Sequence, residues 1–530
     1  MTIGYLCLTL HAHLPYVRHP EHEDFLEEDW LFEAITESYV PLLRACERLD
    51  ADGVRYRLTF DVTPPLAAML ADPLLQGRYR RHLEKLRELV EREVRGNPEG
   101  APVGRLARFY RRFLADTRAW VEERWGGNLV DAFRAAQERG SVELMTCNAT
   151  HGYLPLMSSE GARRTQVRVG VEAFRRAFGR APRGIWLAEC AYAPGIDRLL
   201  VDEGLDYFFL DGHGLLHGEP RPAYGVYAPV QTPAGCHAFG RDADASRQVW
   251  SAREGYPGDP LYREFYRDLG YDADYGYIRP FLHQDGVRRG VGLKYYRVTG
   301  SGPLHEKAYY DPDAALERAA LHASHFLSQR QAQARWLRPR LDRPPIVVAP
   351  YDAELFGHWW FEGPMFLEYL CRQAAYDQDE IELVTPSEYL DRHPHVQEQE
   401  PCPSSWGAEG YATVWLNGAN APFYRHQHHA EARMADLARR FPAATGADKE
   451  ALDQAARELL LAQSSDWAFI ITNGTSVPYA VRRWREHLAS FARLADGVQA
   501  GRVDAAEVAR LRSRDAIFPW LDYRVFGDGA

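Results

Sequence analysis

Two short apolar stretches of this chain end in carboxylates. Residues 185–188 run directly into Glu189, and the stretch that begins at Ile346 runs into Asp352. Catalytic side chains of parallel barrels lie at such carboxyl ends of strands. Two carboxylates there can cleave a glycosidic bond, because one attacks the anomeric carbon while the other protonates the leaving oxygen. Glu189 is therefore the candidate nucleophile and Asp352 the candidate general acid/base, whereas Glu354 suits a supporting charge near a helix N-terminus.

Two histidines, His11 and His13, follow the first apolar run, residues 3–10. Strand alternation places His11 and His13 on the same face, where imidazoles could hydrogen-bond a sugar. With Asp61, at the end of a second predicted strand (residues 55–62), they would also suit the metal of a polysaccharide deacetylase. Both could instead be buried structural histidines. The presence of Glu189 and Asp352 favours sugar binding.

Aromatic side chains follow Asp352 closely. Phe356 and the pair Trp359-Trp360 could form an apolar wall that raises the pKa of an acid. Trp360 is a candidate glucan contact, although the two tryptophans could equally pack in a core.

Composition narrows the class of partner. The 530 residues carry a net charge of −11, which argues against nucleic acid, since phosphate binding needs clustered Lys and Arg. No apolar stretch approaches a membrane span, and the N-terminus lacks the basic region of a signal peptide. The seven scattered cysteines have no CxxC spacing, which indicates reduced thiols and a cytoplasmic protein.

The order of elements predicts a parallel α/β barrel. Strand signals alternate with helical segments, and seven strands are expected at residues 3–10, 55–62, 142–147, 184–188, 206–210, 346–350 and 381–384. Residues 66–138 are helical, rich in Arg and Glu, and interrupt this alternation as an insertion. Residues 212–312 are rich in Gly, Pro and Tyr, and are expected to be irregular and functional.

A different pattern begins near residue 400. Helical segments are expected near 424–441, 447–463, 478–495 and 504–513. The apolar stripe of the second segment continues into Gln463, Asp466 and Trp467. Because polar groups on a buried stripe need partners, this helix end is expected to point into a site.

Taken together, these motifs resemble glycoside hydrolase family 57, and within it most closely the 1,4-α-glucan branching enzymes. The resemblance extends from residue 11 to residue 469 and is carried by His11-Ala12-His13, ELMTCNATHGYLPL with Glu143, WLAEC with Glu189, PYDAELFGHWW with Asp352, SSWGAEGYATVWLN and QSSDWAFI.

The resemblance implies a (β/α)7 barrel with an inserted helical subdomain and a C-terminal all-helical domain. The corresponding boundaries are 1–400 for the barrel, 64–140 for the insertion and 401–530 for the C-terminal domain. It also implies a retaining double displacement on α-glucan without metal or organic cofactor. Glu189 matches the family nucleophile and Asp352 its acid/base, and the matching glucan contacts are His11, His13, Trp406, Asp466, Arg253, Gly270 and Ser476.

Several activities fit the same residues. A hydrolytic α-amylase or a 4-α-glucanotransferase would use them with another acceptor, and a non-catalytic glucan-binding protein would keep only the aromatics. Branching members of the family are expected to carry a tyrosine on a mobile loop over the site. That loop is expected within 212–245, where the tyrosines are Tyr224 and Tyr227, but its expected tip, residues 232–242, contains none.

Overall fold

A curved parallel sheet forms the centre of the molecule. The computed structural model describes residues 2–251 and 253–527. Within them, seven parallel strands follow one another around the sheet in the order β7-β5-β4-β3-β2-β1-β8. Their bounds are β1 (Gly4–Ala12), β2 (Leu58–Val62), β3 (Val142–Cys147), β4 (Gly184–Trp186), β5 (Tyr207–Leu210), β7 (His237–Gly240) and β8 (Ile346–Asp352).

The two edge strands approach each other and close the sheet. The backbone N–H of Asp242, just after β7, donates to the carbonyl of Val348 in β8 at 2.9 Å. A second bond, 2.9 Å long, joins the N–H of Ile346 to the carbonyl of Tyr227. The predicted barrel of seven strands is therefore confirmed.

One of the seven predicted strands is present but does not belong to the barrel. β9 (Ile381–Leu383) pairs only with the first residues of β1, Gly4–Leu6, and lies outside the ring. The seventh strand of the ring is β7, which lies inside the segment expected to be irregular. Its four residues, HAFG, do not form an apolar run like that of β5, and its place is set by pairing with β5.

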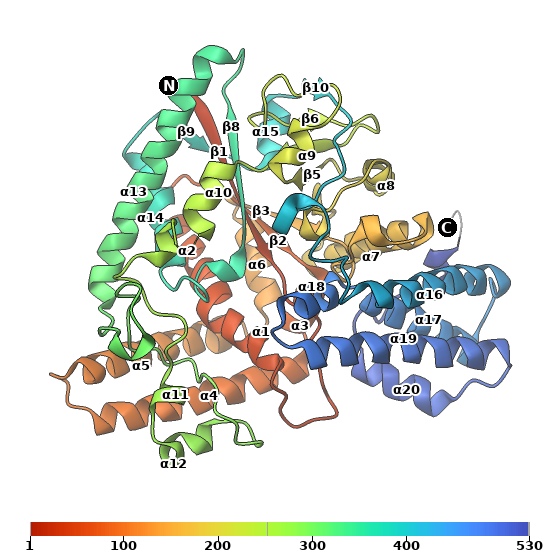
Figure 1. The fold of residues 1–530 in the computed structure, drawn as a ribbon, viewed down its shortest axis with the longest axis horizontal. Helices are drawn as coiled ribbons and strands as arrows, with labels where there is room; N and C mark the ends of the chain where they lie inside the picture. The colour runs from red at the N-terminus through yellow and green to blue at the C-terminus, as the bar shows by residue number, and fades with distance from the viewer. Residues whose placement is uncertain (1, 252, 528–530) are drawn as a thin grey trace.

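Helices cover the outer side of the sheet (Figure 1). They include α2 (Val40–Ala51), α7 (Glu160–Phe178), α13 (Pro312–Leu337) and α14 (Gly363–Tyr376). α7 shows why the chain folds this way locally: the Ser159 side chain caps its first turn, and Gly179 ends it in the left-handed conformation. α13 packs on α14, and α14 packs on α2.

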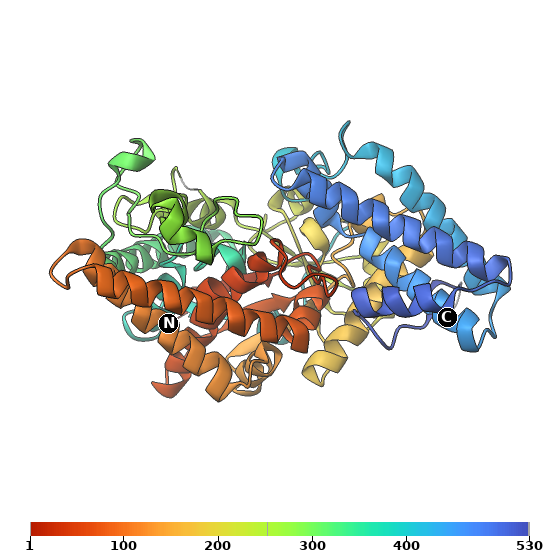
Figure 2. The same cartoon turned by 90° about the horizontal axis from the view of Figure 1, so that it is seen from below.

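Two long helices project from the barrel. α4 (Pro73–Gly96) and α5 (Pro102–Arg118) pack on each other and are drawn in orange along the lower left of Figure 2. They follow α3 (Pro64–Leu70), and α6 (Leu129–Glu138) then returns the chain to the barrel by packing on β3. These helices are the inserted helical subdomain.

Residues 421–514 form a helical bundle on the opposite side of the molecule from α5 (Figure 1). Its helices are α16 (Ala421–Arg440), α17 (Gly446–Ala462), α18 (Ser465–Asn473), α19 (Val477–Gln499) and α20 (Ala505–Arg514). α17 lies at its centre, in contact with α16, α19 and α20. Its C-terminal end reaches the barrel, where the N–H of Ser465 donates to the carbonyl of His151 at 2.9 Å.

Two further expectations concern the whole chain. All seven cysteines are free, as expected for reduced thiols. Among the described residues, no helix has both the length and the apolar character that crossing a bilayer requires.

Candidate active site

Glu189 occupies a strained turn immediately after β4. Its backbone is left-handed, with φ +64° and ψ +22°, and Cys190 also has a positive φ of 50°. Such conformations are uncommon outside glycine and concentrate at functional sites. The turn is held from the C-terminal part of the chain, because the N–H of Trp406 donates to the Glu189 carbonyl at 2.9 Å.

Both carboxylate oxygens of Glu189 accept hydrogen bonds from the C-terminal part of the chain. The indole N–H of Trp406 donates to Oε2 at 2.8 Å, and the hydroxyl of Ser465 donates to Oε1 at 2.9 Å. Burial raises the pKa of Glu189 to about 7, and the charge of Asp466 raises it further, whereas the two hydrogen bonds and His13 oppose the shift. Near neutral pH this carboxyl group is therefore close to half ionised.

Asp352 ends β8 and lies in register with His11 of β1. Burial raises its pKa well above the ordinary value, and the negative charges of Glu354 and Glu189 add to the shift, while Arg241 opposes it. A carboxyl group held protonated in this way can donate a proton to a leaving oxygen. Because the charge of Glu189 contributes to the pKa of Asp352, the two carboxyl groups interact electrostatically.

His13 links the barrel to the start of α18. Its Nε2 lies 3.0 Å from Oδ1 of Asp466, and its Nδ1 lies 3.0 Å from the Thr63 hydroxyl. Burial lowers the pKa of His13, but Asp466 more than offsets this, so that the pKa is raised overall. The pKa of Asp466 is correspondingly lowered by His13 despite burial. The shifts in both pKa values favour an imidazolium–carboxylate pair at this position.

His11 lies deeper than His13. It stacks on the indole of Trp186, with ring centroids 4.8 Å apart. Its Nδ1 hydrogen-bonds Oδ2 of Asp61, and its Nε2 lies 3.1 Å from Nε2 of His151. Both ring nitrogens are thus engaged within the protein, and neither is free to contact a sugar in this structure.

The metal site expected for a deacetylase is not assembled from His11, His13 and Asp61. His11 and Asp61 bind each other, while His13 turns toward Asp466. Among the described residues near Glu189, the group whose ligand atoms lie within 4.8 Å of one another is His13, His151 and Asp466.

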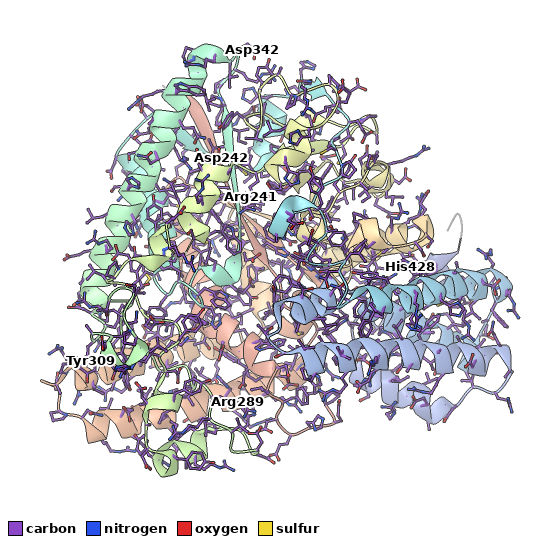
Figure 3. All side chains as sticks on the ribbon, in the orientation of Figure 1. Arg241, Asp242, Arg289, Tyr309, Asp342 and His428 are labelled. Carbon is purple, nitrogen blue, oxygen red and sulfur yellow. The ribbon has the colours of Figure 1, made fainter. Side chains whose placement is uncertain are left out.

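Trp406 has aromatic and cationic neighbours. Its ring meets Trp186 edge-on at 5.0 Å and Trp250 edge-on at 6.1 Å. The guanidinium of Arg241 lies 5.7 Å from the ring centroid. Figure 3 shows Arg241 and Asp242 where β7 leads into α10 (Ala243–Trp250). This surround fixes the indole that bonds Glu189.

Trp360 lies in the core of this structure, which does not favour the predicted glucan contact. Its side chain is 1% exposed and packs among Tyr262, Phe356 and Phe366. Within the irregular stretch after β8, sequence periodicity does not distinguish an inward from an outward side chain. Trp359 is the exposed member of the pair, at 53%, and stacks on Phe265 with centroids 4.3 Å apart.

The structure does not bring the three remaining predicted contacts to Glu189. Arg253 is an exposed residue in the turn after α10. Gly270 lies in α11 (Leu269–Asp272), where any side chain would meet the carbonyl of Arg289. Ser476 precedes α19 and lies beyond the end of α18 that is opposite Asp466; that end is about 10 Å from Asp466 along the helix axis.

The expected loop tip at residues 232–242 is not a loop over the site. His237–Gly240 within it is the barrel strand β7. Neither candidate tyrosine lies near Asp352: the Tyr227 carbonyl binds the N–H of Ile346 at the opposite end of β8, and the Tyr224 hydroxyl donates to Asp342 at 2.8 Å.

Sequence reasoning missed His151 and Ser465. The two are joined at 2.8 Å between Nδ1 and the hydroxyl oxygen. His151 has a positive φ of 57°. It lies in the motif ELMTCNATHGYLPL, in which only Glu143 was singled out from the sequence. Glu143 itself accepts hydrogen bonds from Tyr207, at 2.7 Å, and from Ser387, which follows the outer strand β9.

These features define a class of protein. A parallel barrel with two buried carboxyl groups at its strand ends, imidazoles beside them and tryptophans around them is the equipment of a glycoside-cleaving enzyme. The chain belongs to glycosyl hydrolase family 57, whose model matches residues 7–400. A second model, described as 1,4-alpha-glucan branching enzyme, C-terminal, matches residues 426–526.

Relatives agree over nearly the full length. A 1,4-alpha-glucan branching enzyme of Thermococcus kodakarensis is 34% identical, over 97% of this chain and 77% of that protein. The structure of an alpha-amylase, AmyC, from Thermotoga maritima is 44% identical with a TM-score of 0.92 and covers 99% of both chains. A branching enzyme structure from Pyrococcus horikoshii is 33% identical with a TM-score of 0.89, covering 100% of this chain and 98% of that one.

Proposed function

We propose that this chain is a 1,4-α-glucan branching enzyme, which cleaves an α-1,4 bond and re-forms an α-1,6 branch. One observation carries the proposal: the segment that matches the branching-enzyme C-terminal model supplies Ser465 to the barrel carboxylate Glu189 and Asp466 to His13. The part of the chain typical of branching enzymes is thus built into the site of cleavage. The relatives named as branching enzymes support the same conclusion.

The first chemical step is attack of Glu189 on the anomeric carbon. As the α-1,4 bond breaks, Asp352 transfers its proton to the departing oxygen, and a glycosyl–Glu189 ester forms. This step needs Glu189 ionised and Asp352 protonated. The pKa of Glu189 near 7 and the strongly raised pKa of Asp352 support that division, since the working protonation state is then populated near neutral pH.

The second step resolves the ester. The 6-hydroxyl of another glucan attacks the anomeric carbon while Asp352 accepts its proton, and Glu189 leaves as a carboxylate. The hydrogen bonds from Trp406 and Ser465 stabilise the charge that returns to Glu189. The ion pair of His13 and Asp466 is suited to hydrogen-bond the sugar hydroxyls. Neither step calls for a metal ion or an organic cofactor.

Hydrolysis is the second candidate, and the resemblance to AmyC favours it. A hydrolase would use Glu189 and Asp352 in the same way, with water in place of the 6-hydroxyl. A 4-α-glucanotransferase would use a 4-hydroxyl. The acceptor therefore separates the three activities, and the cleavage step does not.

Product analysis tests the proposal. The protein is incubated with amylose, and the products are divided between proton NMR, which counts α-1,6 linkages, and a reducing-end assay, before debranching and sizing of the chains. Branching predicts new α-1,6 linkages with few new reducing ends. Reducing ends without new linkages would establish hydrolysis instead.

Two variants act as controls for the chemistry. Glu189→Gln removes the nucleophile but keeps groups able to bond Trp406 and Ser465, and Asp352→Asn removes the acid. Both are expected to lose at least about 10³-fold in kcat while still binding amylose. Full activity of Glu189→Gln would refute the mechanism.

The setting follows from the same proposal. The substrate is an α-glucan of the amylose or glycogen type, and the reaction belongs to storage-polysaccharide synthesis in the cytoplasm. Free cysteines and the net charge of −11 support this placement and argue against a nucleic-acid partner. We also propose that the barrel comprises residues 1–400, the insertion 64–140 and the C-terminal domain 401–530.

A further inference from the structure

A continuous row of hydrogen bonds connects Glu189 to a second buried carboxyl group, Asp61. Oδ2 of Asp61 bonds Nδ1 of His11, and Nε2 of His11 lies 3.1 Å from Nε2 of His151. Nδ1 of His151 lies 2.8 Å from the Ser465 hydroxyl, which is 2.9 Å from Oε1 of Glu189. All five side chains are buried. Water therefore has little access to any link.

The chemistry of His11, His151 and Ser465 means that all the hydrogen bonds in the row must point in the same direction. A neutral imidazole donates from one nitrogen and accepts at the other, and a hydroxyl has a single proton to donate. If Ser465 donates to Glu189, His151 must donate to Ser465, His11 must donate to His151, and Asp61 must carry a proton and donate to His11. The reversed row leaves Asp61 ionised and puts the proton on Glu189.

A third arrangement would put the proton on an imidazole, but the surroundings oppose it. Burial lowers the pKa of His11 and of His151 well below the ordinary value, and the stacked His13 lowers both further. The ring centroids of His13 and His151 are only 3.7 Å apart, and Asp466 raises the pKa of His13, which favours a positive charge on that ring. A second positive charge in this stack is unfavourable.

The surroundings of Asp61 favour its neutral form. The side chain is completely buried, and its Oδ1 has no hydrogen-bond partner among the described residues. Burial raises the pKa of Asp61 well above the ordinary value, and the charge of Glu354 adds to the shift. An ionised Asp61 would leave a buried charged oxygen without compensation.

We propose that Asp61 and Glu189 share one proton through His11, His151 and Ser465, and that its residence on Asp61 keeps Glu189 ionised for attack. The inference rests on the proposed role of Glu189 as nucleophile. His11, His151, Ser465 and Asp61 are positioning residues in this scheme, because they act through Glu189 and not on the sugar.

The exchange of the proton balances along the row. The proton on Oδ2 of Asp61 passes to Nδ1 of His11, the Nε2 proton of His11 passes to Nε2 of His151, and the Nδ1 proton of His151 passes to the Ser465 oxygen. The hydroxyl proton of Ser465 then passes to Oε1 of Glu189. The net result is ionised Asp61 and neutral Glu189. A neutral Glu189 cannot attack a sugar.

Other ionisable groups face this row and contribute to its titration. They are His13 and Glu354 beside His11 and Asp61, Asp466 beside His151 and Glu189, Asp352 across from Glu189, Arg241 over Trp406, and Cys147 near Asp61. The test must therefore compare variants that change these groups equally.

Two substitutions at Asp61 make such a comparison. Asp61→Asn and Asp61→Val both remove the carboxyl group, and both residues have similar bulk, but only Asn can still donate to Nδ1 of His11. We expect the acid limb of the kcat/KM–pH profile to lie about one pH unit higher in Asp61→Val than in Asp61→Asn, because only Asn still orients Ser465 toward Glu189. Coinciding limbs would overturn the proposal, since loss of charge alone affects both variants alike.

Infrared difference spectroscopy provides a measurement that does not depend on activity or on the folding of Asp61→Val. At pH 7 the spectrum of the wild type minus that of Asp61→Asn is expected to contain a protonated-carboxyl band. A carboxylate band in its place would show that Asp61 is ionised and would refute the relay. If amylose is not cleaved at all, the proposed function fails, whereas the infrared result still decides the relay.

Discussion

The hydrogen bond from Trp406 to Glu189 allows the pKa of the nucleophile to be changed by a small substitution. In Trp406→Phe the aromatic ring remains to pack on Trp186 and Arg241, but the indole N–H that donates to Oε2 at 2.8 Å is lost. The bond stabilises the ionised carboxylate, so its loss raises a pKa that burial already holds at about 7.

The expected shift follows from the strength of such bonds. A hydrogen bond to a charged group contributes about 1.5–3 kcal/mol, and about 1.4 kcal/mol corresponds to one pKa unit. The pKa of Glu189 is therefore expected to rise by about one to two units in Trp406→Phe. At pH 7 the ionised fraction then falls from about one half to about one tenth or less.

The pH dependence of kcat/KM on amylose measures this shift. Since only ionised Glu189 attacks, activity is lost as the pH falls through its pKa, and the acid limb of the profile moves upward in the variant. Trp250→Phe is a matched control, because Trp250 touches the Trp406 ring but its indole nitrogen has no hydrogen-bond partner among the described residues. Its acid limb is expected to stay in place.

An unmoved acid limb in Trp406→Phe, with a folded protein, would refute this reasoning. It would mean that the limb belongs to a group other than Glu189, or that the indole does not stabilise the ionised form. Equal shifts in Trp406→Phe and Trp250→Phe would point to loss of packing and not of the hydrogen bond.

Three further predictions test other parts of the description. Glu189→Gln removes a carboxyl group whose folded pKa of about 7 lies above the ordinary 4.5. In the wild type, the free-energy penalty for ionising this buried group grows as the pH rises from about 4.5 and is complete above about 7. In denaturant melts the variant should therefore be more stable than the wild type by up to about 3 kcal/mol at pH 8 and show no gain at pH 4. Treatment with EDTA should leave activity unchanged, because His11 is bound to Asp61 and His13 to Asp466; loss of activity in EDTA would contradict this prediction. Excess Zn²⁺ should inhibit the enzyme by binding His13, His151 and Asp466. Trp360→Ala should lower the free energy of unfolding by about 3–5 kcal/mol with little change in KM, as expected of a core residue, and a large rise in KM would restore its role as a glucan contact.

The barrel was predictable where its strands are long. β1 contains seven consecutive buried residues and β8 contains six, and each strand has a residue suited to chemistry at its carboxyl end, His11 in β1 and Asp352 in β8. β7 was missed although β5 is equally short, because the sequence of β7, HAFG, is not the apolar run that marks β5, and its position depends on pairing with β5. β9 was counted in the ring because an apolar run of three or four residues looks the same whether or not it completes a barrel.

The two carboxyl groups could be found from the sequence, but their surroundings could not. Glu189 and Asp352 directly follow apolar strands, and this position is visible in one sequence. His151 was missed because it lies in a turn whose positive φ cannot be inferred from its neighbours. The burial of Trp360 was not foreseen, because the direction of a tryptophan after a strand depends on packing partners such as Tyr262, about a hundred residues away.

The arrangement around Glu189 also predicts that the C-terminal part of the chain is needed for the proposed chemistry. The barrel alone would leave a carboxyl group in a strained turn with neither of its donors, because Trp406 and Ser465 both come from beyond residue 400. The contact between His13 of the barrel and Asp466 likewise joins the two parts of the chain. Since these contacts lower a pKa that burial raises, the part of the chain beyond residue 400 is expected to influence the reactivity of the proposed nucleophile.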